Sequence, residues 1–529
     1  MTDGTDLPAN PTHEGLIAQG WNWTVAQLKA QLLAMPEQTV YVGQMYTTVS
    51  GATEIDVEMQ EGRLDPILTI CPNGTISVDW GDGTTPDSVT GSSTTTRQAV
   101  SHTYASAGNY TIKISKTSGT NYGLYCDQSY TLLRKNTTQN QNHVYAKTIK
   151  RIRIGADISY ITGSFHYCSS LSSITIPSSV AYIDTNAFTF CYSLSSVTIP
   201  SGVARISASA FYNCFSLSSI SIPSSVTYIG SSVFYYCLSL SSISIPSSVT
   251  FIGSNAFNCC STLSSITIPS GVTEIKSNMF YDCYALKSVT IPSNVTIIED
   301  GAFQYCNSLS SITIPSGVTS IAQKTFYGCY ALKSITIPSG VTSIAKQAFY
   351  NCNSLSSITI PSSVASIGEN AFYGCLALKS ITIPSGVTSF DIGLFQNCNS
   401  LSSVTIPSTV TSIGKNAFNY CYALTSITIP SSVTSIGNST FSSCYSLSNL
   451  TIPSSVTSID GNAFAYCYGM KEYHFQRTTP PTLGTSAFSS IVSDCIIYVP
   501  YSADHSILEA YQTETNWSEY ASYMQEEPQ

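Results

Sequence analysis

The chain has 529 residues and a formal net charge of −9, and only 10% of its residues are charged, compared with about 25% in a typical globular protein. Proteins that bind nucleic acid need basic stripes or patches, which this composition does not supply, so we expect no nucleic acid partner. No run of 18 or more apolar residues occurs, so no membrane span is predicted. The length predicts more than one domain.

The first segment, residues 1–40, begins with the letters MTDGTDLPANPTHEG, which lack the basic start and the apolar core of a signal peptide. Either a Met has replaced a signal peptide, or the protein leaves its cell without one, as a virion component does at lysis. Apolar residues at Val25, Leu28, Leu32 and Leu33, followed by a proline, predict a short amphipathic helix. This helix is expected to pack against the rest of the chain or, alternatively, to serve attachment or oligomerisation.

The second segment, residues 41–148, contains the stretches ISVDWGDGTT and SHTYASAGNYTIKI. They resemble the two hallmark segments of a PKD domain, an immunoglobulin-like β-sandwich of extracellular and surface proteins. The resemblance implies that Trp80 fills the sandwich core and that His102 and Tyr104 stand at the start of a late strand. The glycines of Gly81–Gly83 favour a tight turn with positive φ.

Three aspartates in this segment, Asp79, Asp82 and Asp87, raise the alternative of a calcium site. Aspartate beside glycine is, however, the ordinary chemistry of a turn, because its side chain bonds to the backbone two residues further on. We therefore predict turn residues here and no metal.

The third segment, residues 149–470, repeats with a strict period of 23 residues. Such a period is the signature of a solenoid, in which each coil contacts mainly its two neighbours. Prolines recur with the same step from Pro177 to Pro453. The periodic cysteines lie at positions 168, 191, 214, 237, 260, 283, 306, 329, 352, 375, 398, 421, 444 and 467.

One unit, LSSVTIPSTVTSIGKNAFNYC, shows why the chain repeats. Val404, Thr405 and Ile406 alternate between apolar and polar as a strand does, and Pro407 ends the strand because it cannot donate to a ladder. A turn, a second short strand and about one helix-compatible turn follow. A single unit buries too little surface to offset the entropy of ordering it. Stacked units share ladders and bury both faces, which predicts a long rod or arc with a regular surface.

The pattern L-x-x-I-x-I-P-x-x-V-x-x-I-x-x-x-A-F-x-x-C resembles the BspA-like (Treponema pallidum-type) leucine-rich repeat. The predicted fold is mostly β: an N-terminal β-sandwich, then a leucine-rich-repeat solenoid of about fourteen coils, then a C-terminal cap. The first unit is one residue short and has Ile154 where later units have proline, as expected of a terminal coil. Family members are bacterial or protist surface proteins or phage-borne proteins, and they are associated with adhesion.

The last segment, residues 471–529, is predicted to be a degenerate repeat and a cap that covers the open edge of the sheet. The letters IIYVP, residues 496–500, read as a last strand, and residues 506–524 as one or two helices. The resemblance extends to this end, because family members often carry a similar segment with the order YVP, AY, W and Y.

The fourteen periodic cysteines are predicted to form a buried row of thiols, with bridges or metal as alternatives. Neighbouring coils lie about 4.8 Å apart, but side chains in one row point the same way, whereas a disulfide needs converging Cβ atoms. No CxxC pair favours metal. Cys259, beside Cys260, lies off the row and is expected to be partly exposed.

No catalytic site is predicted, and we expect no enzyme activity and no cofactor. Of the six histidines only His166 lies within the regular coils, so the serine and cysteine rows have almost no base beside them. The chain has no phosphate loop, no HExxH and no GxSxG. Glu299 and Asp300 are adjacent, and we interpret them as a solvated turn.

The candidate binding residues lie on the regular surface of the repeats. Outward threonines and serines form ladders that suit a flat hydroxyl-rich binding face, or else reflect β-propensity and solubility. Tyrosines after the periodic cysteines suit recognition, or else pack between coils. The residues chosen are Tyr284, Tyr330, Tyr422, Thr313, Thr336 and Thr359.

The predicted function is a non-catalytic extracellular or cell-surface protein that binds a host or cell-surface protein or glycan, as in adhesion. The alternative is a structural or receptor-binding component on the surface of a phage virion, assembled through the N-terminal segment. An accessory module of an enzyme is a third hypothesis.

Overall fold

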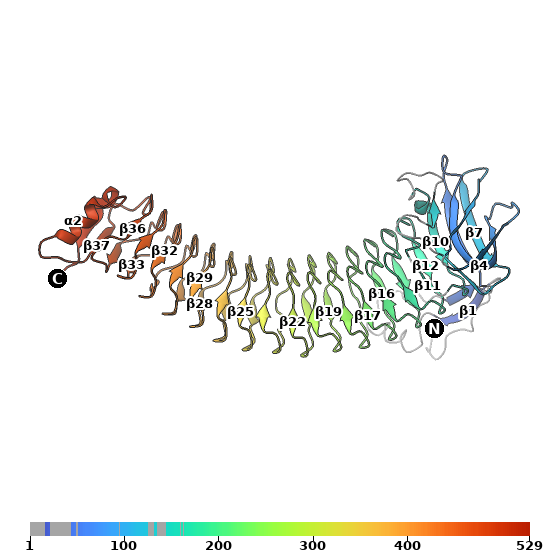
Figure 1. The fold of residues 1–529 in the computed structure, drawn as a ribbon, viewed down its shortest axis with the longest axis horizontal. Helices are drawn as coiled ribbons and strands as arrows, with labels where there is room; N and C mark the ends of the chain where they lie inside the picture. Colours follow the sequence, from blue (N-terminus) through green and yellow to red (C-terminus); the bar gives the residue numbers. More distant parts are fainter. Residues whose placement is uncertain are drawn as a thin grey trace, which may run out of the picture. The chain divides into compact units, whose positions relative to one another are not determined.

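The structure is a computed structural model that describes residues 16–21, 44–48, 51–94, 96–124, 132–134, 144–158, 160–161 and 163–529. The helix predicted around Val25–Leu33 lies outside the described residues. The chain divides into two compact units, residues 1–226 and 227–529, which are described separately. Figure 1 labels many of their strands and helices.

The first unit begins with antiparallel strands. Strand β4 has thirteen residues and takes part in two sheets, because its first half pairs with β6 and β9 and its second half with β5 and β7. The strands are β1 (Leu16–Trp21), β2 (Gln44–Thr48), β3 (Thr53–Met59), β4 (Ile67–Asp79), β5 (Asp87–Ser92), β6 (Gln98–Ser101), β7 (Gly108–Lys116), β8 (Asn121–Gly123) and β9 (Leu133–Arg134).

The strand that follows the 3-10 helix η1 (Ala146–Thr148) connects this sheet to the repeats. Strand β10 (Ile149–Arg153) pairs antiparallel with β3 on one side and parallel with β12 (Ser173–Thr175) on the other. Arg153 donates from Nε to Glu54 at 2.7 Å and from both terminal nitrogens to Asp56, at 3.1 and 3.0 Å. The first coil is thus a continuation of the sheet that precedes it, which is why its sequence departs from that of the later coils.

Two short strands recur in most coils, one of about three residues and one of two, and parallel partners in adjacent coils lie 23 residues apart, as Val197 and Ile220 do. In the first unit, the remaining strands are β11 (Tyr160–Ile161), β13 (Tyr182–Ile183), β14 (Ser196–Thr198), β15 (Arg205–Ile206) and β16 (Ser219–Ser221). In β14 and β16 the middle residue is buried and its two neighbours face outward, as the period of two requires.

The second unit is built from coils of the same kind. Its strands are β17 (Tyr228–Ile229), β18 (Phe251–Ile252), β19 (Ser265–Thr267), β20 (Glu274–Ile275), β21 (Ser288–Thr290), β22 (Ile297–Ile298), β23 (Ser320–Ile321), β24 (Ser334–Thr336), β25 (Ser343–Ile344), β26 (Ser357–Thr359), β27 (Ser366–Ile367), β28 (Ser380–Thr382), β29 (Ser389–Phe390), β30 (Ser403–Thr405), β31 (Ser412–Ile413), β32 (Ser435–Ile436), β33 (Asn449–Ile452), β34 (Ser458–Ile459), β35 (Glu472–Phe475), β36 (Thr482–Leu483), β37 (Ile496–Val499) and β38 (Met524–Glu526). The fold is mostly β, with a solenoid of about 16 turns of ~23 residues, which confirms the predicted class and adds turns to the predicted fourteen.

A stack of phenylalanine rings fills the centre of the coils. Phe303, Phe326 and Phe349 are fully buried, and their ring centroids follow one another at 5.7 and 5.5 Å with nearly parallel planes. These spacings lie within the 4.5–7 Å range of favourable aromatic pairs. Each coil therefore supplies one ring to an aromatic column that no single coil could bury.

The cysteines that the structure describes are all buried thiols, which confirms the predicted buried row. The thiol of one coil donates a hydrogen bond to the phenylalanine carbonyl of the coil before it, as Cys329 does to Phe303 at 3.2 Å. Cys259 lies off the row, as predicted, but it is buried and not partly exposed; its sulfur lies 3.8 Å from the Asp282 carboxylate. Packing against the next coil covers it.

These thiols should be unreactive in the folded protein. Burial raises the pKa of Cys398 to about 12 and that of Cys467 to about 12, and only the thiolate reacts with an alkylating reagent. At pH 8 we expect no labelling of the periodic cysteines in the native protein, and labelling of most of the fourteen in denaturant without reductant. Mass spectrometry of both samples measures this, and seven stable disulfides would contradict the buried-thiol arrangement.

The segment that precedes each periodic cysteine is not the predicted helix-compatible turn. Two of its residues have left-handed backbone conformations, as Asn416 (φ 58°) and Tyr420 (φ 61°) do. The N–H groups of Asn416, Phe418 and Tyr420 then all point to the next coil and donate to carbonyls 22 residues ahead, at 2.9, 2.9 and 3.0 Å. Hydrogen bonds between coils thus outweigh the local preference for a right-handed turn.

The C-terminal end is closed by helix α2 (Ser506–Thr513), the 3-10 helix η2 (Ser518–Tyr523) and one further strand, β38. The predicted last strand, β37, is not the last, because β38 pairs with it in parallel. Trp517 is fully buried, and its ring centroid lies 5.0 Å from that of Phe475 and 5.8 Å from that of Phe488. Its indole Nε1 donates to the Pro481 carbonyl at 2.8 Å. This aromatic cluster covers the end of the core.

Candidate functional site

The three candidate threonines lie together on one face of the second unit. Thr336 and Thr359 are register partners in β24 and β26, and Thr313 forms a β-bridge with Thr336. All three side chains are exposed, while the isoleucines before them, such as Ile335, are buried. With the outward serine of each strand, they form a ladder of hydroxyls whose rungs repeat about every 4.8 Å. The structure therefore places these three predicted residues in one surface.

The three candidate tyrosines do not form one site. Tyr284 and Tyr330 lie two coils apart and are 47% and 39% exposed. A hydrogen bond with Asp282, together with burial, raises the pKa of Tyr284. Tyr422 lies four coils beyond Tyr330 and is partly covered, because its ring stacks on Tyr445 at 4.8 Å. Each of the three tyrosines therefore has different neighbours. If they bind a ligand, each contacts it alone and not as part of one common site.

A second tyrosine row was not predicted from the sequence. Tyr327, Tyr350 and Tyr373 stand two residues before a periodic cysteine, and their rings stack at 4.5 and 4.3 Å with planes within 2°. Asn397 donates from Nδ2 to the Tyr373 hydroxyl at 2.7 Å and ends the stack. The letters FYGC, FYNC and FYGC in three successive units were the available signal. These rings are half-buried, which favours packing between coils.

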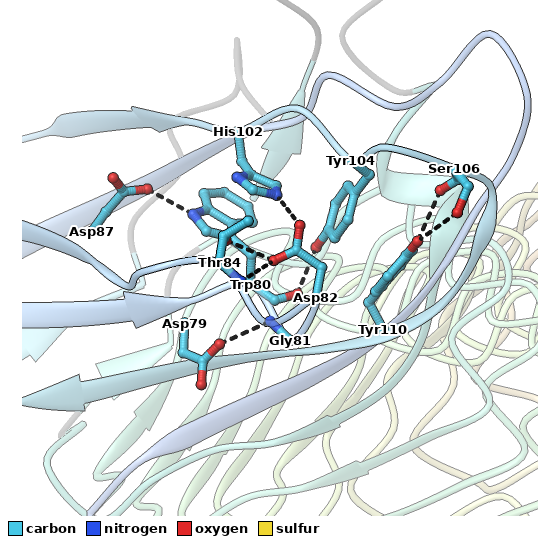
Figure 2. Close-up of polar contacts among 10 residues, drawn as sticks. All are labelled: Asp79, Trp80, Gly81, Asp82, Thr84, Asp87, His102, Tyr104, Ser106 and Tyr110. Carbon is cyan, nitrogen blue, oxygen red and sulfur yellow. Dashed lines mark hydrogen bonds and ion pairs between the residues drawn. The ribbon is translucent and has the colours of Figure 1, made fainter.

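The aspartates of the N-terminal segment lie around Trp80 (Figure 2). Trp80 is buried, its indole Nε1 donates to Asp87 at 2.7 Å, and its ring stacks on His102 with centroids 4.8 Å apart. The Tyr104 hydroxyl donates to the Trp80 carbonyl at 3.0 Å. His102 and Tyr104 lie between β6 and β7, not at the start of a strand, because β7 begins only at Gly108.

Two of the three aspartates have partners in the turn, and the third, Asp87, accepts from the Trp80 indole. Asp79 accepts from the Gly81 N–H at 2.9 Å, and Asp82 accepts from Thr84 and lies 2.8 Å from Nε2 of His102 (Figure 2). Gly81 and Gly83 have φ values of 75° and 83°, so the tight turn has the predicted conformation. Within the described residues, no group of three or more His, Cys, Asp or Glu side chains could hold a metal ion. This site is therefore a hydrogen-bonded turn packed on an aromatic cluster.

Glu299 is not the solvated turn residue that we predicted. It accepts from the Ser277 N–H at 2.9 Å and from the Ser277 hydroxyl at 2.7 Å, and it pairs with Lys276 at 3.0 Å. Burial opposes ionisation, but the bonds from Ser277 and Lys276 outweigh it and hold the pKa of Glu299 below its usual value. The Glu299 carboxylate thus connects two successive coils, whereas Asp300 is exposed in a turn, as predicted.

The coil geometry has a counterpart among known repeats. Three overlapping matches to the model of the BspA-type leucine-rich repeat region, each of six copies, cover residues 159–287, 273–402 and 388–510. The chain belongs to the BspA-type leucine-rich repeat family. None of the curated proteins compared with the chain matches it significantly.

Several solved structures resemble this BspA-type chain. A leucine-rich repeat protein from Bacteroides ovatus is 24% identical with a TM-score of 0.52, over 76% of this chain and 97% of that one, and it shares the fold. A leucine-rich cell surface protein from Faecalibacterium prausnitzii is 31% identical with a TM-score of 0.40, over 66% and 94% of the two chains. A T. pallidum leucine-rich repeat protein is 25% identical with a TM-score of 0.21, over 44% and 78%.

The BspA-type repeats suggest a role in binding a protein or another ligand, and proteins with such repeats are typically not enzymes. Of the residues that the structure describes, none form a helix with the length and apolar character to cross a membrane. The hydroxyl ladder and the exposed tyrosines are thus the candidate binding features of these coils.

Proposed function

We propose that the protein is a non-catalytic, extracellular or cell-surface adhesion protein that uses its BspA-type coils to bind a protein or glycan on a cell surface. The observation that carries this proposal is the ladder around Thr336, where exposed hydroxyls repeat in register over adjacent coils. Regular rungs let weak contacts add along an extended target by multivalency. Because the chain is sparsely charged, contact must come from hydroxyls and aromatic faces, so salt should have little effect on binding.

The division of the chain into parts belongs to the same proposal. We infer an N-terminal segment over residues 1–40, a PKD-like sandwich over 41–148, a solenoid over 149–470 and a cap over 471–529. The buried Trp80 and the positive φ values of the adjacent glycines support the PKD-like part. In this arrangement the sandwich serves as a support for the coils.

A role as a phage virion component remains the alternative proposal. It relies on attachment through residues 1–40, most of which lie outside the described residues. The gene neighbourhood distinguishes the two proposals, because a virion protein is encoded among tail or capsid genes.

The proposed surface can be tested by charge insertion. Replacement of Thr313, Thr336 and Thr359 by lysine should weaken binding to target cells at least tenfold, since three charges would break a neutral hydroxyl face, while the fold is retained because all three side chains are exposed. A separate variant carries serine at Tyr284, Tyr330 and Tyr422, and should weaken binding less, because these rings lie apart. Flow cytometry of labelled protein on cells measures both.

The matched control carries lysine at Ser320, Ser343 and Ser366, outward positions on the second strands of the same region. It should bind as the parent does. If the threonine and tyrosine variants are folded and also bind as the parent does, the repeat surface is a spacer. The binding site would then lie in the PKD-like part or the N-terminal segment.

A further inference from the structure

Five tyrosines gather on the last regular coils of the second unit. Tyr422, Tyr445 and Tyr468 follow successive periodic cysteines, and their ring centroids are 4.8 and 5.5 Å apart. Tyr420 and Tyr466 each precede a periodic cysteine. The ring centroid of Tyr420 lies 6.0 Å from that of Tyr422, and the ring centroid of Tyr466 lies 6.2 Å from that of Tyr468. Four of the five side chains are between 39% and 53% exposed, which makes this tyrosine cluster an accessible aromatic surface.

The backbone explains how the cluster is presented. Tyr420 and Tyr466 have left-handed conformations, with φ of 61° and 60°, and their rings are turned 72° and 64° from the stacked row. The coil between them has a buried serine, Ser443, at the same position. The rings of Tyr420 and Tyr466 are therefore tilted relative to the stacked row. They belong to coils that are two apart, at a separation of roughly 10 Å, and Ser443 occupies the same position in the coil between them.

The cluster is electrically neutral. Between residues 416 and 459 the chain carries no charged side chain, and Asp460 is the only one between residues 416 and 470. Lys471, the next one along, is paired with Asp494 at 2.7 Å. Within the described residues, the hydroxyls of Tyr445 and Tyr468 have no hydrogen-bond partner and can accept or donate to a ligand. A charged ligand would find no counter-charge here.

The chemistry of this surface matches that of a neutral sugar. A pyranose ring has an apolar face of C–H groups, which packs on an aromatic ring, and a rim of hydroxyls, which bonds to phenolic and serine hydroxyls. Protein interfaces are enriched in methionine and arginine as well as in aromatic residues, whereas the exposed large side chains of this cluster are tyrosines alone. We propose that the tyrosine cluster binds a neutral oligosaccharide. This inference rests on the proposed adhesion function and adds to the hydroxyl ladder a second site, with its own ligand class.

The repeats themselves supply substitutions that should preserve the fold. Other coils have asparagine at the position before the cysteine, as Asn351 and Asn397 do with φ of 55° and 61°. Others have asparagine after the cysteine, as Asn307 and Asn353 do. Replacement of the five cluster tyrosines by asparagine therefore copies neighbouring coils and keeps the left-handed conformations accessible.

The experiment uses the full chain in affinity electrophoresis through gels that contain dextran, mannan, amylose or mixed-linkage β-glucan, with polygalacturonate as a charged control. We expect at least one neutral polysaccharide to retard the parent. The five-asparagine variant should lose at least tenfold in affinity, with an unchanged circular dichroism spectrum. The control variant, Tyr192→Asn with Tyr236→Asn, changes exposed tyrosines that follow or precede a periodic cysteine in other coils, and should retain the parent affinity.

The outcomes separate this inference from the proposed function. Equal glycan affinity of the parent and the five-asparagine variant would place the site elsewhere and overturn the inference. Binding of the parent to cells without binding to any neutral polysaccharide, and loss of that binding after protease treatment of the cells, would also overturn it and would indicate a protein partner for the adhesion function. Binding to neither cells nor polysaccharides would overturn the adhesion function as well.

Discussion

Replacement of Phe326 by alanine is expected to lower the free energy of unfolding by about 3–5 kcal/mol, the range for removal of a buried aromatic side chain. The ring is fully buried and stacks on Phe303 at 5.7 Å and on Phe349 at 5.5 Å. Its removal leaves a cavity that both neighbours face. Because each coil contacts mainly its neighbours, the loss should first loosen the coils on either side.

Urea denaturation measures the total loss, and hydrogen exchange locates it. Protection should fall first in the strands nearest Phe326, β23 and β24, and later toward either end. The control is Thr336→Ala, an exposed position of the same region, where we expect a change within about 0.5 kcal/mol. A loss confined to a surface turn would show that the phenylalanine column does not hold the core together.

Replacement of Trp517 by alanine should have an effect of similar size, about 3–5 kcal/mol, at one end of the molecule. The indole contacts Phe475, Phe488 and Tyr511, and its N–H is bonded to the Pro481 carbonyl. Without it, the last strands would be the first to open, since the cap would no longer exclude water from the end of the core.

The variant Trp517→Phe serves as the matched comparison. It keeps an aromatic ring but loses the hydrogen bond, so a smaller loss of about 1–3 kcal/mol is expected for the unpaired carbonyl and the lost volume. Hydrogen exchange over β35, β37 and β38 reports both variants. Unchanged protection of these strands in Trp517→Ala would mean that the cap does not stabilise the last coils.

The regular part of the coil was predictable because its signals are local. Val404 and Ile406 alternate with polar residues, Pro407 stops the strand, and the period of 23 repeats both. The left-handed residues before each cysteine were not predictable in this way. Tyr420 has no intrinsic preference for positive φ, and it adopts this conformation because its N–H bonds to Ser442 in the next coil. That bond exists only after stacking.

The surface residues also divide into those whose direction could be predicted from the sequence and those whose direction could not. The exposure of Thr336 follows directly from the period of two in a strand. The tyrosines follow the cysteines at the irregular corner of the coil, where strand periodicity gives no direction to a side chain. Tyrosines stack where successive units carry one, as Tyr422 and Tyr445 do. Where the next unit has another residue, a tyrosine such as Tyr330 stands alone and exposed.

Strand β10 has a mechanical consequence. It is bonded on one edge to β3 and on the other to β12, and Arg153 adds ion pairs to Glu54 and Asp56 across the first of these pairings. A pulling force directed along β10 would load all the hydrogen bonds of both ladders in shear at the same time, whereas a force across the sheet would open them one by one. In the proposed adhesion role, where flowing liquid pulls on the protein, the connection that β10 makes between β3 and the first coil would then resist tension as a single block.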